Sequence, residues 1–461
     1  MVEGRTHKPV IQSSQCQSCN VCLRGCPAEL ILEYRQEEES LRGALYSGRI
    51  SAVSSTTNVP PLSPCQEACP IRQDTKGYVS LIARGKFREA LEMIREVNPL
   101  PSVCGFICHH PCEEACLREE VDGPVPMRLL KRFVAEHERE GNRPFRRPGK
   151  KKREKVLVIG SGPAGLTAAN DLCLLGYEVT LVEALPVLGG MLAVGIPEFR
   201  LPRDVLNLEI EGVRELGVNM MVNHRFLLEG NGKPFSRKGF QATFLSVGAH
   251  RGMRLNIPGE NRERVLSGVQ FLREVNLGKA LRVGRRVAVI GGGNVALDCA
   301  RSATRLGAET VEIYYRRSRD EMPALREEVE EAVREGIEIH FLVSPVQVIG
   351  KGKRPAGVEF VRMRLGEPDA SGRPRPIPIE DSVFKVKADT VISAVGQRID
   401  PRGLRGLDTH PDGTVRIDPE TGATSMRGVF AGGDAVTGPG WAIDAIAAGK
   451  RGARSIDRFL S

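Results

Sequence analysis

"KVLVIGSGPAGLTAANDLCLLGYEVTLVE", residues 155–183, is the stretch that decides the fold. An apolar strand pattern leads into a G-x-G-x-x-G turn, a helical pattern and a second strand that ends in an acid. The first glycine permits a tight turn, the second lets the backbone approach a pyrophosphate, and the third lets the helix pack on the strand. The helix N-terminus then faces the phosphates, and the acid holds a ribose hydroxyl. A purely structural glycine turn is disfavoured because strand, helix and acid are in register. The predicted contacts are Gly160, Gly162, Pro163, Ala164, Gly165 and Glu183.

The pattern occurs a second time in "RVAVIGGGNVALDCARSATRLGAETVEIYYRRS", residues 286–318. Its turn is Gly291-x-Gly293-x-x-Ala296, but no acid closes its second strand. Arg316 and Arg317 stand there instead, and arginines can pair with a 2′-phosphate that an acid would repel. We expect a nicotinamide dinucleotide site that favours NADP, with NAD as the alternative.

Two later stretches indicate that the first nucleotide domain is split. "ADTVISAVGQ", residues 388–397, is an apolar strand that leaves the second domain. "GVFAGGDAVTGPGWAIDAIAAGKRGARSI", residues 428–456, predicts a strand, an aspartate turn and a helix. In flavoproteins with two dinucleotide sites such an aspartate meets the ribityl–pyrophosphate arm, and the helix dipole stabilises a reduced, anionic flavin. FAD is therefore expected in the first site and NAD(P) in the second. Further predicted FAD contacts are Gly190, Gly433, Asp434, Trp441, Ala442 and Ile443.

Ten of the twelve cysteines lie in the first 116 residues. "CQSCNVCLRGCP", residues 16–27, has the C-x2-C-x2-C-x3-C-P spacing of bacterial [4Fe-4S] ferredoxins, and a zinc knuckle is the alternative. A second group follows on short helices and turns, where His109 and His110 are more readily solvated or capping residues than ligands. The candidate ligands are Cys16, Cys19, Cys22, Cys26, Cys65, Cys69, Cys104, Cys108, Cys112 and Cys116.

Composition limits the compartment and the partners. "MVEGRTHKPV" has no apolar signal core and no run of eighteen apolar residues occurs, so a cytoplasmic protein with reduced thiols and no membrane insertion is expected. The net charge is +9, and residues 142–155 carry eight basic residues and one acidic residue. Without a recognition motif this run predicts an exposed linker rather than nucleic-acid binding, with docking of an acidic electron-transfer partner as a second role.

Residues 61–461 resemble the small subunit of glutamate synthase and the N-terminal part of dihydropyrimidine dehydrogenase. The carrying stretches are "NPLPSVCG", "GSGPAG", "GIPEFRLPRDV", "GGGNVALDCA", "YYRRSRDEMPA" and "VFAGGDAV". The resemblance implies a flavin contact for Arg200. It also implies a nicotinamide dinucleotide turn at Gly293, Asn294 and Val295, and 2′-phosphate contacts for Arg316 and Arg317.

The chain departs from this family in its cysteines. Two-cluster members carry a further CxxC before the position of Cys65, where this chain reads "STTNVPPLSP". They also use a polar ligand after the position of Cys116, where Lys131 and Arg132 cannot serve. One all-cysteine cluster is therefore expected here, from Cys69, Cys108 and Cys112 with a fourth ligand among Cys65, Cys104 and Cys116. The resemblance gives Cys104 no ligating role. The N-terminal run then supplies a second cluster.

The expected fold is α/β: two Rossmann-like domains, the FAD domain split by an inserted NAD(P) domain, after a Cys-rich helical iron–sulfur region. The predicted domains are a cluster arm (1–60), a helical iron–sulfur domain (61–141), a basic linker (142–155), the first FAD half (156–261), the NAD(P) domain (262–397) and the second FAD half (398–461).

The expected function is electron transfer between NAD(P)H and a protein partner through FAD and two [4Fe-4S] clusters. Hydride transfer needs no catalytic acid or base, and none is assigned. Disulfide reduction is disfavoured because only the lone Cys173 and Cys299 follow residue 116. The predicted partners are other subunits of an oxidoreductase complex or a ferredoxin-type carrier. Alternatives are glutamate synthase small subunit proper, a stand-alone FAD enzyme for a small substrate, and a non-catalytic assembly subunit.

Overall fold

The computed structural model describes residues 62–137, 148–226, 239–350, 352–369 and 372–461. The chain divides into two compact units, Met1–Phe145 and Arg146–Ser461. The predicted ligands Cys16, Cys19, Cys22 and Cys26 lie outside the described residues, as do residues 142–147 of the predicted basic linker. The domain boundaries predicted from the sequence stay predictions.

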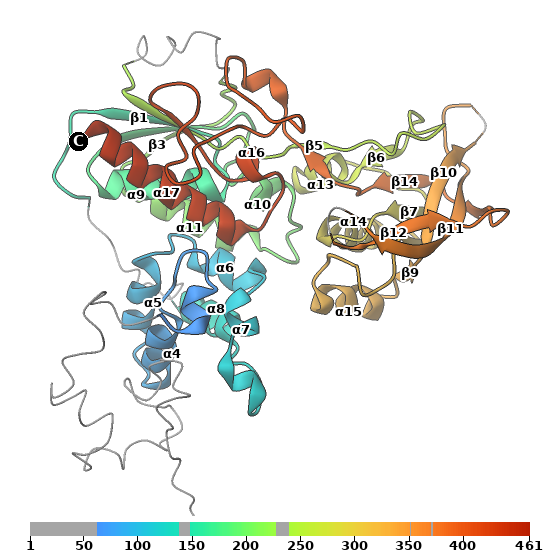
Figure 1. Cartoon of the computed structure of the whole chain (residues 1–461), viewed down its shortest axis with the longest axis horizontal. Helices are drawn as coiled ribbons and strands as arrows, with labels where there is room; N and C mark the ends of the chain where they lie inside the picture. The colour runs from blue at the N-terminus through green and yellow to red at the C-terminus, as the bar shows by residue number, and fades with distance from the viewer. Residues whose placement is uncertain (1–61, 138–147, 227–238, 351, 370–371) are drawn as a thin grey trace, which may run out of the picture. The chain divides into compact units, whose positions relative to one another are not determined.

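The first unit is helical throughout its described part (Figure 1). Proline occupies the first turn of three of its helices, where a missing N–H is tolerated, and the Asp74 side chain caps another by accepting from Gly77 N at 2.9 Å. Tyr78, Leu91 and Ile94 form the centre of its core. Its elements are α3 (Pro64–Glu67), α4 (Thr75–Ala83), α5 (Phe87–Arg95), α6 (Pro101–Ile107), α7 (Pro111–Glu114), η3 (Leu117–Glu120) and α8 (Met127–His137).

The second unit contains two parallel five-stranded sheets. The first has the order β16-β4-β1-β2-β3, so its outer strand β16 comes from the end of the chain. Its strands are almost continuously apolar because helices cover both faces of a parallel sheet. The strands are β1 (Lys155–Ile159), β2 (Glu178–Val182), β3 (Asn219–Met221), β4 (Ala242–Leu245) and β16 (Val429–Ala431).

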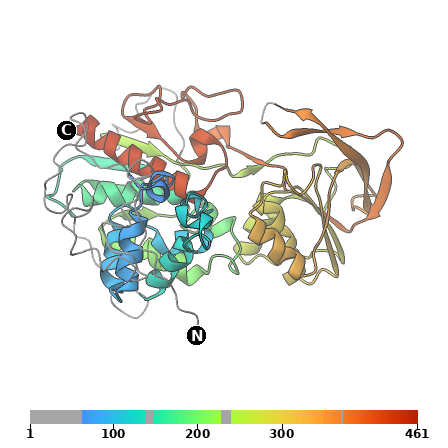
Figure 2. The same cartoon turned by 60° about the horizontal axis from the view of Figure 1, so that its bottom comes forward.

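Helix α17 (Ala442–Leu460) packs along α9 (Pro163–Leu174) beside this sheet, as both views show (Figures 1 and 2). A Cβ at Gly449 of α17 would lie 2.3 Å from the Ala164 carbonyl oxygen, so the two helices meet backbone to backbone. The last helix of the chain is thereby fixed against the first helix of the nucleotide motif. The remaining helices of this part are α10 (Met191–Val194), α11 (Arg203–Glu215) and α16 (Asp434–Thr437).

The second parallel sheet has the order β6-β14-β7-β8-β9. Its strand β7 leads into α14 through the second glycine turn, and Val289, Leu297 and Ile313 lie at the centre of its core. The elements are β6 (Val265–Ser267), α13 (Gly268–Asn276), β7 (Arg286–Ile290), α14 (Asn294–Arg305), β8 (Thr310–Tyr314), α15 (Arg326–Arg334), β9 (Glu338–His340) and β14 (Thr390–Ser393).

An antiparallel sheet adjoins this second sheet, drawn in orange in Figures 1 and 2. It consists of β10 (Val343–Ile349), β11 (Gly357–Pro368), β12 (Pro374–Pro378) and β13 (Phe384–Lys387). The chain enters and leaves the second parallel sheet through β5 (Arg251–Gly252) and β15 (Gln397–Arg398), which pair antiparallel.

The predicted fold class is confirmed. The first sheet takes β1–β4 from before the second sheet in sequence and β16 from after it, as an inserted domain requires. No helix in the described ranges is long and apolar enough to cross a bilayer.

Candidate functional site

The first glycine turn follows β1, and its backbone geometry explains its composition. Gly160 has φ +98°, and a Cβ there would lie 2.3 Å from the Ser246 carbonyl oxygen. A Cβ at Gly165 would lie 1.9 Å from the carbonyl oxygen of Gly160 itself. Gly162 is the opposite case, because a Cβ there would meet nothing within 4 Å. Gly160 and Gly165 therefore allow the tight turn. Gly162 faces open space beside the start of α9, as the approach of a pyrophosphate to the backbone requires.

Glu183 follows β2 and is bonded to the turn. Its Oε2 accepts from Ser161 N at 2.9 Å and Ser161 Oγ at 2.6 Å, and its Oε1 accepts from Leu185 N at 2.9 Å. The side chain is buried. Glu183 thus connects the end of β2 with the glycine turn, and no sequence pattern indicated that Ser161 would bind it.

The last part of the chain completes this site. Gly433 has φ +67°, and a Cβ there would lie 3.0 Å from Ala164 Cβ at the start of α9. Asp434 follows at the start of α16, where burial raises the pKa of its carboxyl to about 6 against the lowering effect of the Gly440 N–H. Helix α17 begins at Ala442 with Trp441 as its N-cap and Ile443 buried. Gly190 also belongs here, since a Cβ on it would lie 2.8 Å from Gly162 Cα.

The second glycine turn repeats the arrangement after β7. Gly291 has φ +144°, and a Cβ there would lie 2.3 Å from the Ala394 carbonyl oxygen. At Gly293 the nearest atom to such a Cβ is Pro323 Cγ at 3.9 Å, so this glycine also faces open space. Asn294 opens α14 and accepts from Leu325 N at 3.0 Å, and the partly buried Val295 follows it.

The two arginines after β8 lie in different environments. Arg316 is exposed. Arg317 is buried, and its Nε donates to the Pro374 carbonyl oxygen at 2.8 Å while its guanidinium pairs with Asp369. Arg317 therefore joins the end of β8 to the antiparallel sheet, and of the two only Arg316 has a side chain open to solvent.

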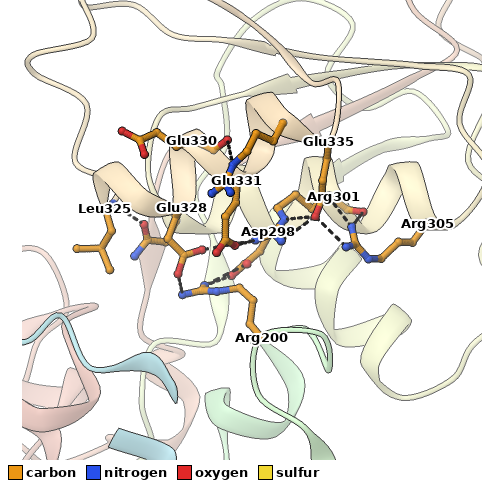
Figure 3. A network of polar contacts seen from close by, with 11 residues as sticks. Arg200, Asp298, Arg301, Arg305, Leu325, Glu328, Glu330, Glu331 and Glu335 are labelled. Atoms are coloured by element: carbon orange, nitrogen blue, oxygen red, sulfur yellow. Dashed lines mark hydrogen bonds and ion pairs between the residues drawn. The ribbon is translucent and has the colours of Figure 1, made fainter. Parts of the chain in front are cut away.

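Arg200 lies in a network that the sequence did not reveal (Figure 3). Its guanidinium donates to Asp298 Oδ1 at 3.1 Å and Oδ2 at 2.9 Å, and it also pairs with Glu328. Burial raises the pKa of Asp298 to about 6 and that of Glu328 to about 7, although Arg200 opposes both shifts. The one available sequence signal was a lone acid, Asp298, on the apolar face of a helix.

The same network contains a second layer of charges. Arg301 donates to Glu331 at 2.9 Å and Glu335 at 2.7 Å, and Arg305 donates to Glu335 at 2.7 Å. The guanidinium carbon of Arg305 lies 3.9 Å from the ring centroid of Phe199, the neighbour of Arg200. Figure 3 shows these side chains converging from α14, α15 and the loop that carries Arg200. The network thus ties a loop of the first nucleotide site to the helices of the second.

The six cysteines in the described part of the first unit lie on or next to three short helices. Cys65 and Cys112 lie on α3 and α7, and Cys104 lies on α6. Cys108 is the C-cap of α6, and Cys69 and Cys116 come two residues after the ends of α3 and α7. All are buried except the half-buried Cys116, and all are free thiols. Burial raises the pKa of Cys104 and of Cys112 to about 12 and also raises that of Cys108. Thiols so placed become thiolates only when a positive centre takes their charge.

Polar groups surround the sulfurs. Thr75 Oγ1 donates to Cys65 Sγ at 3.0 Å, and His110 N donates to Cys108 Sγ at 3.4 Å. Gln73 is fully buried four residues after Cys69, and neither atom of its side-chain amide has a hydrogen-bond partner among the described residues. A buried amide without partners costs about 1–3 kcal/mol, so an unmet donor and acceptor mark a place that a bound group or water completes.

The described sulfurs are spaced more widely than those of a zinc site. Within the described ranges, no three cysteine sulfurs lie within 4.8 Å of one another. In a tetrahedral zinc site, bonds of about 2.3 Å place the sulfurs roughly 3.8 Å apart. The described thiols of the first unit therefore do not form a preformed zinc site, whereas cysteine thiolates are the usual ligands of iron–sulfur clusters.

Two protein families match successive parts of the chain. Residues 154–449 match the family described as pyridine nucleotide-disulphide oxidoreductase, and residues 61–143 match the family described as dihydropyrimidine dehydrogenase domain II, 4Fe-4S cluster. The second match confirms the predicted iron–sulfur region in the first unit.

Full-length relatives are also similar. The chain is 44% identical over 424 residues to the NADP(+)-dependent formate dehydrogenase subunit beta of Moorella thermoacetica, covering 86% of this chain and 60% of that one. It is 41% identical to the NADPH-Fe(3+) oxidoreductase subunit beta of Geobacter sulfurreducens, covering 64% of that chain. It is 34% identical to the glutamate synthase [NADPH] small chain of Escherichia coli, covering 88% of it. The chain thus spans under two thirds of the length of the first two.

Solved structures share the fold of the second unit. Mycobacterium tuberculosis FprA in complex with NADPH superposes with a TM-score of 0.57 at 21% identity, over 67% of this chain and 85% of that one. Thioredoxin reductase of Lactococcus lactis gives 0.52 at 23% identity, over 67% of this chain and 99% of that one. At these identities the likeness concerns the fold alone.

Proposed function

The chain belongs to the pyridine nucleotide-disulphide oxidoreductase family, in the group that includes the glutamate synthase small chain, and on that premise we propose an electron-transfer subunit. It moves electrons between NAD(P)H and a protein partner, as part of a larger oxidoreductase complex. The observation that carries the proposal is the combination of two glycine-turn nucleotide sites in one unit with a set of buried free thiols in the other.

The first nucleotide site suits FAD. Gly162 leaves the backbone accessible at the start of α9, while Glu183 closes the end of β2. Gly433 and Asp434 lie against α9, and the N-terminus of α17 at Trp441, Ala442 and Ile443 supplies a positive helix dipole. FAD, when bound, exchanges electron pairs with a nicotinamide and single electrons with an iron–sulfur centre, which is the conversion that this function needs.

The second nucleotide site suits NADP. Gly291 closes the turn, and Gly293 with Asn294 and Val295 forms its open side. Arg316 is the proposed partner of the 2′-phosphate because its guanidinium is exposed, and Arg317 holds the segment in place through Asp369. NADP(+) or NADPH appears in the names of the three relatives described above, which supports this choice over NAD.

The described thiols of the first unit suit one [4Fe-4S] cluster. The proposed ligands are Cys69, Cys108 and Cys112, with a fourth from Cys65, Cys104 or Cys116. Cys16, Cys19, Cys22 and Cys26 are proposed to hold a second cluster, which exchanges electrons with the partner. Two similar relatives are named as beta subunits, which supports a partner subunit, and a ferredoxin-type carrier would fit the same chemistry.

Reduction of disulfides is not proposed despite the family name. Cys173 and Cys299 are buried on α9 and α14, and the Cys173 thiol donates to the Leu216 carbonyl oxygen at 2.9 Å. Burial also raises the pKa of Cys299 well above its ordinary value. Neither cysteine belongs to a CxxC pair, so no dithiol stands ready beside the flavin site. Electrons therefore leave through the thiol-rich unit.

Anaerobic reduction of the full-length chain tests this function. The purified protein should contain FAD and iron, and NADPH should bleach both the flavin absorbance and the broad cluster absorbance. Cys19→Ser should spare NADPH-driven bleaching of the flavin and abolish transfer to the protein partner. A colourless protein, or one whose flavin is bleached by NADPH while iron is absent from both cysteine groups, would exclude the proposed function.

A further inference from the structure

A buried lysine lies among the thiols of the first unit. Lys131 sits on α8 and is 5% exposed. It shares one face of the helix with Met127, Val134 and Ala135, all of them buried in the core. A lysine at a core position of an amphipathic helix needs an explanation, because an uncompensated buried charge is strongly destabilising.

The position of Lys131 is fixed by close packing. Helices α6 and α8 touch, since a Cβ at Gly105 would lie 2.7 Å from Arg132 Cα. The ammonium nitrogen lies 6.0 Å from the ring centroid of the fully buried Tyr78, whose hydroxyl donates to the Met127 carbonyl oxygen at 2.9 Å. Lys131 therefore cannot reach water by a small shift of its helix.

Thiols are packed against the helix face that carries Lys131: Cys65 and Cys112 lie in one core cluster with Met127 and Val134. Burial lowers the pKa of Lys131, but Cys104, Cys108, Cys69 and Cys112 together raise it. Conversely, Lys131 is the main influence that lowers the pKa of Cys104, Cys108 and Cys112 against their burial. Among the described residues, no carboxylate forms an ion pair with Lys131. Its counter-ion is thus to be sought in the thiol group itself.

We infer that Lys131 is a fixed counter-charge for the iron–sulfur cluster of the first unit and raises its reduction potential without ligating iron. This inference rests on the proposed function, which puts a cluster on Cys69, Cys108 and Cys112. A thiolate-ligated cluster is negatively charged, and taking up one electron makes it more negative. A buried positive charge beside it stabilises the reduced form, since net charge is one of the determinants of cluster potential. The step transfers one electron and no proton, so Lys131 remains an ammonium throughout.

The test uses the full-length protein and measures potentials rather than turnover. Iron and acid-labile sulfide are counted first, and the midpoint potential is then measured by redox titration with electron paramagnetic resonance. Cys112→Ala identifies which signal belongs to the cluster proposed on Cys69, Cys108 and Cys112. We expect Lys131→Met to shift that midpoint to a more negative potential, with the other signal unmoved. Lys131→Arg, which keeps the charge, should stay close to the wild type.

Control variants separate charge from structure and from ligation. Lys86→Met removes an exposed charge from the same unit and should leave the potential unchanged. If Lys131→Met loses its iron, Lys131→Arg with full iron and a near wild-type potential still supports a counter-charge. Loss of iron in both, or strong hyperfine coupling of the wild-type cluster to a lysine nitrogen, would make Lys131 a ligand and overturn the inference. An unchanged potential in an iron-replete Lys131→Met protein would overturn it too. A wild-type protein without iron would instead refute the proposed function.

Discussion

The two glycine turns of the second unit share their backbone geometry but differ in the charge of the residues that follow the second strand. Each turn begins with a glycine of positive φ, Gly160 or Gly291. A Cβ on either glycine would lie 2.3 Å from a backbone carbonyl oxygen just after a neighbouring strand, that of Ser246 or Ala394. Each leads into a helix of twelve residues. After the second strand they part: the first turn is bonded to the buried acid Glu183, and the second is followed by the exposed Arg316 and the buried Arg317.

This difference separates what builds a nucleotide site from what selects the nucleotide. Backbone crowding explains the first and last glycine of the first motif, whatever ligand binds there. The choice between a ribose hydroxyl and a 2′-phosphate depends on the residue after the second strand, because an acid accepts from one and repels the other. Arg200 then connects the two sites through Asp298 and Glu328.

The largest effect, loss of FAD together with stability, is expected from the third glycine of the first turn. Gly165→Ala would place a methyl group 1.9 Å from the Gly160 carbonyl oxygen and should destabilise the protein by about 3 kcal/mol, with loss of FAD. Denaturant unfolding and flavin content per chain measure both. Gly162→Ala is the control: it meets no atom within 4 Å, so the fold should survive while FAD is retained less well. A stable, FAD-replete Gly165→Ala protein would show that the turn can rearrange.

The selectivity of the second turn is expected to depend on Arg316. Arg316→Gln should weaken the binding of NADPH by about 1.5–3 kcal/mol, the value of a charge-assisted hydrogen bond, and leave the binding of NADH almost unchanged. The dissociation constants of both nucleotides measure this. Arg286→Gln, at the opposite end of β7, is the matched control. Arg317→Gln should reduce the stability of the protein because its ion pair with Asp369 is lost, and it should weaken the binding of both nucleotides alike. Equal losses of affinity for NADPH and NADH in Arg316→Gln would contradict the proposed contact with the 2′-phosphate.

The link between the two sites should appear in the pH dependence of stability. The pKa of Glu328 is about 7 in the folded protein, against about 4 for an unfolded carboxyl, so the folded state binds more protons between these values. Stability from this group is therefore present below about pH 4 and is lost as pH rises to about 7. Glu328→Gln should remove most of that fall, about 3–4 kcal/mol for a pKa difference of about three units, whereas the exposed Glu330→Gln should not. Identical pH profiles for the wild type and Glu328→Gln would contradict the buried pair.

The smallest effect is expected where the second turn differs from the first. Ala296 takes the place of the third glycine and is fully buried within α14. Ala296→Gly should therefore lower stability by only about 1 kcal/mol, the cost of glycine inside a helix, with nucleotide binding unchanged. Thermal unfolding and NADPH titration check this. A gain in stability would show that the second helix is held off its strand by the alanine methyl group.

The fold could be predicted from local sequence patterns because the glycine turns depend on residues that are only a few positions apart. Gly160 and Gly165 constrain each other directly, and strand and helix periodicity surrounds them. Contacts between residues far apart in the chain could not be predicted from local sequence patterns. Arg317 pairs with Asp369 across fifty-two residues, and Arg200 with Asp298 across ninety-eight. Lys131 could be seen only as an unsuitable ligand, since its burial among thiols depends on how α8 packs against α6.

The strand order of the first sheet has a consequence for synthesis of the chain. β4 ends at Leu245, but its outer neighbour β16 begins only at Val429, about 180 residues later. At about 5–20 residues per second, a ribosome leaves that edge of β4 open for roughly 10 to 40 s. During this interval the nascent sheet exposes an unpaired apolar strand, which is a template for pairing with other chains. In the proposed site the flavin also needs α17, so a chain terminated before Val429 should lack flavin absorbance even where its thiol-rich unit holds a cluster.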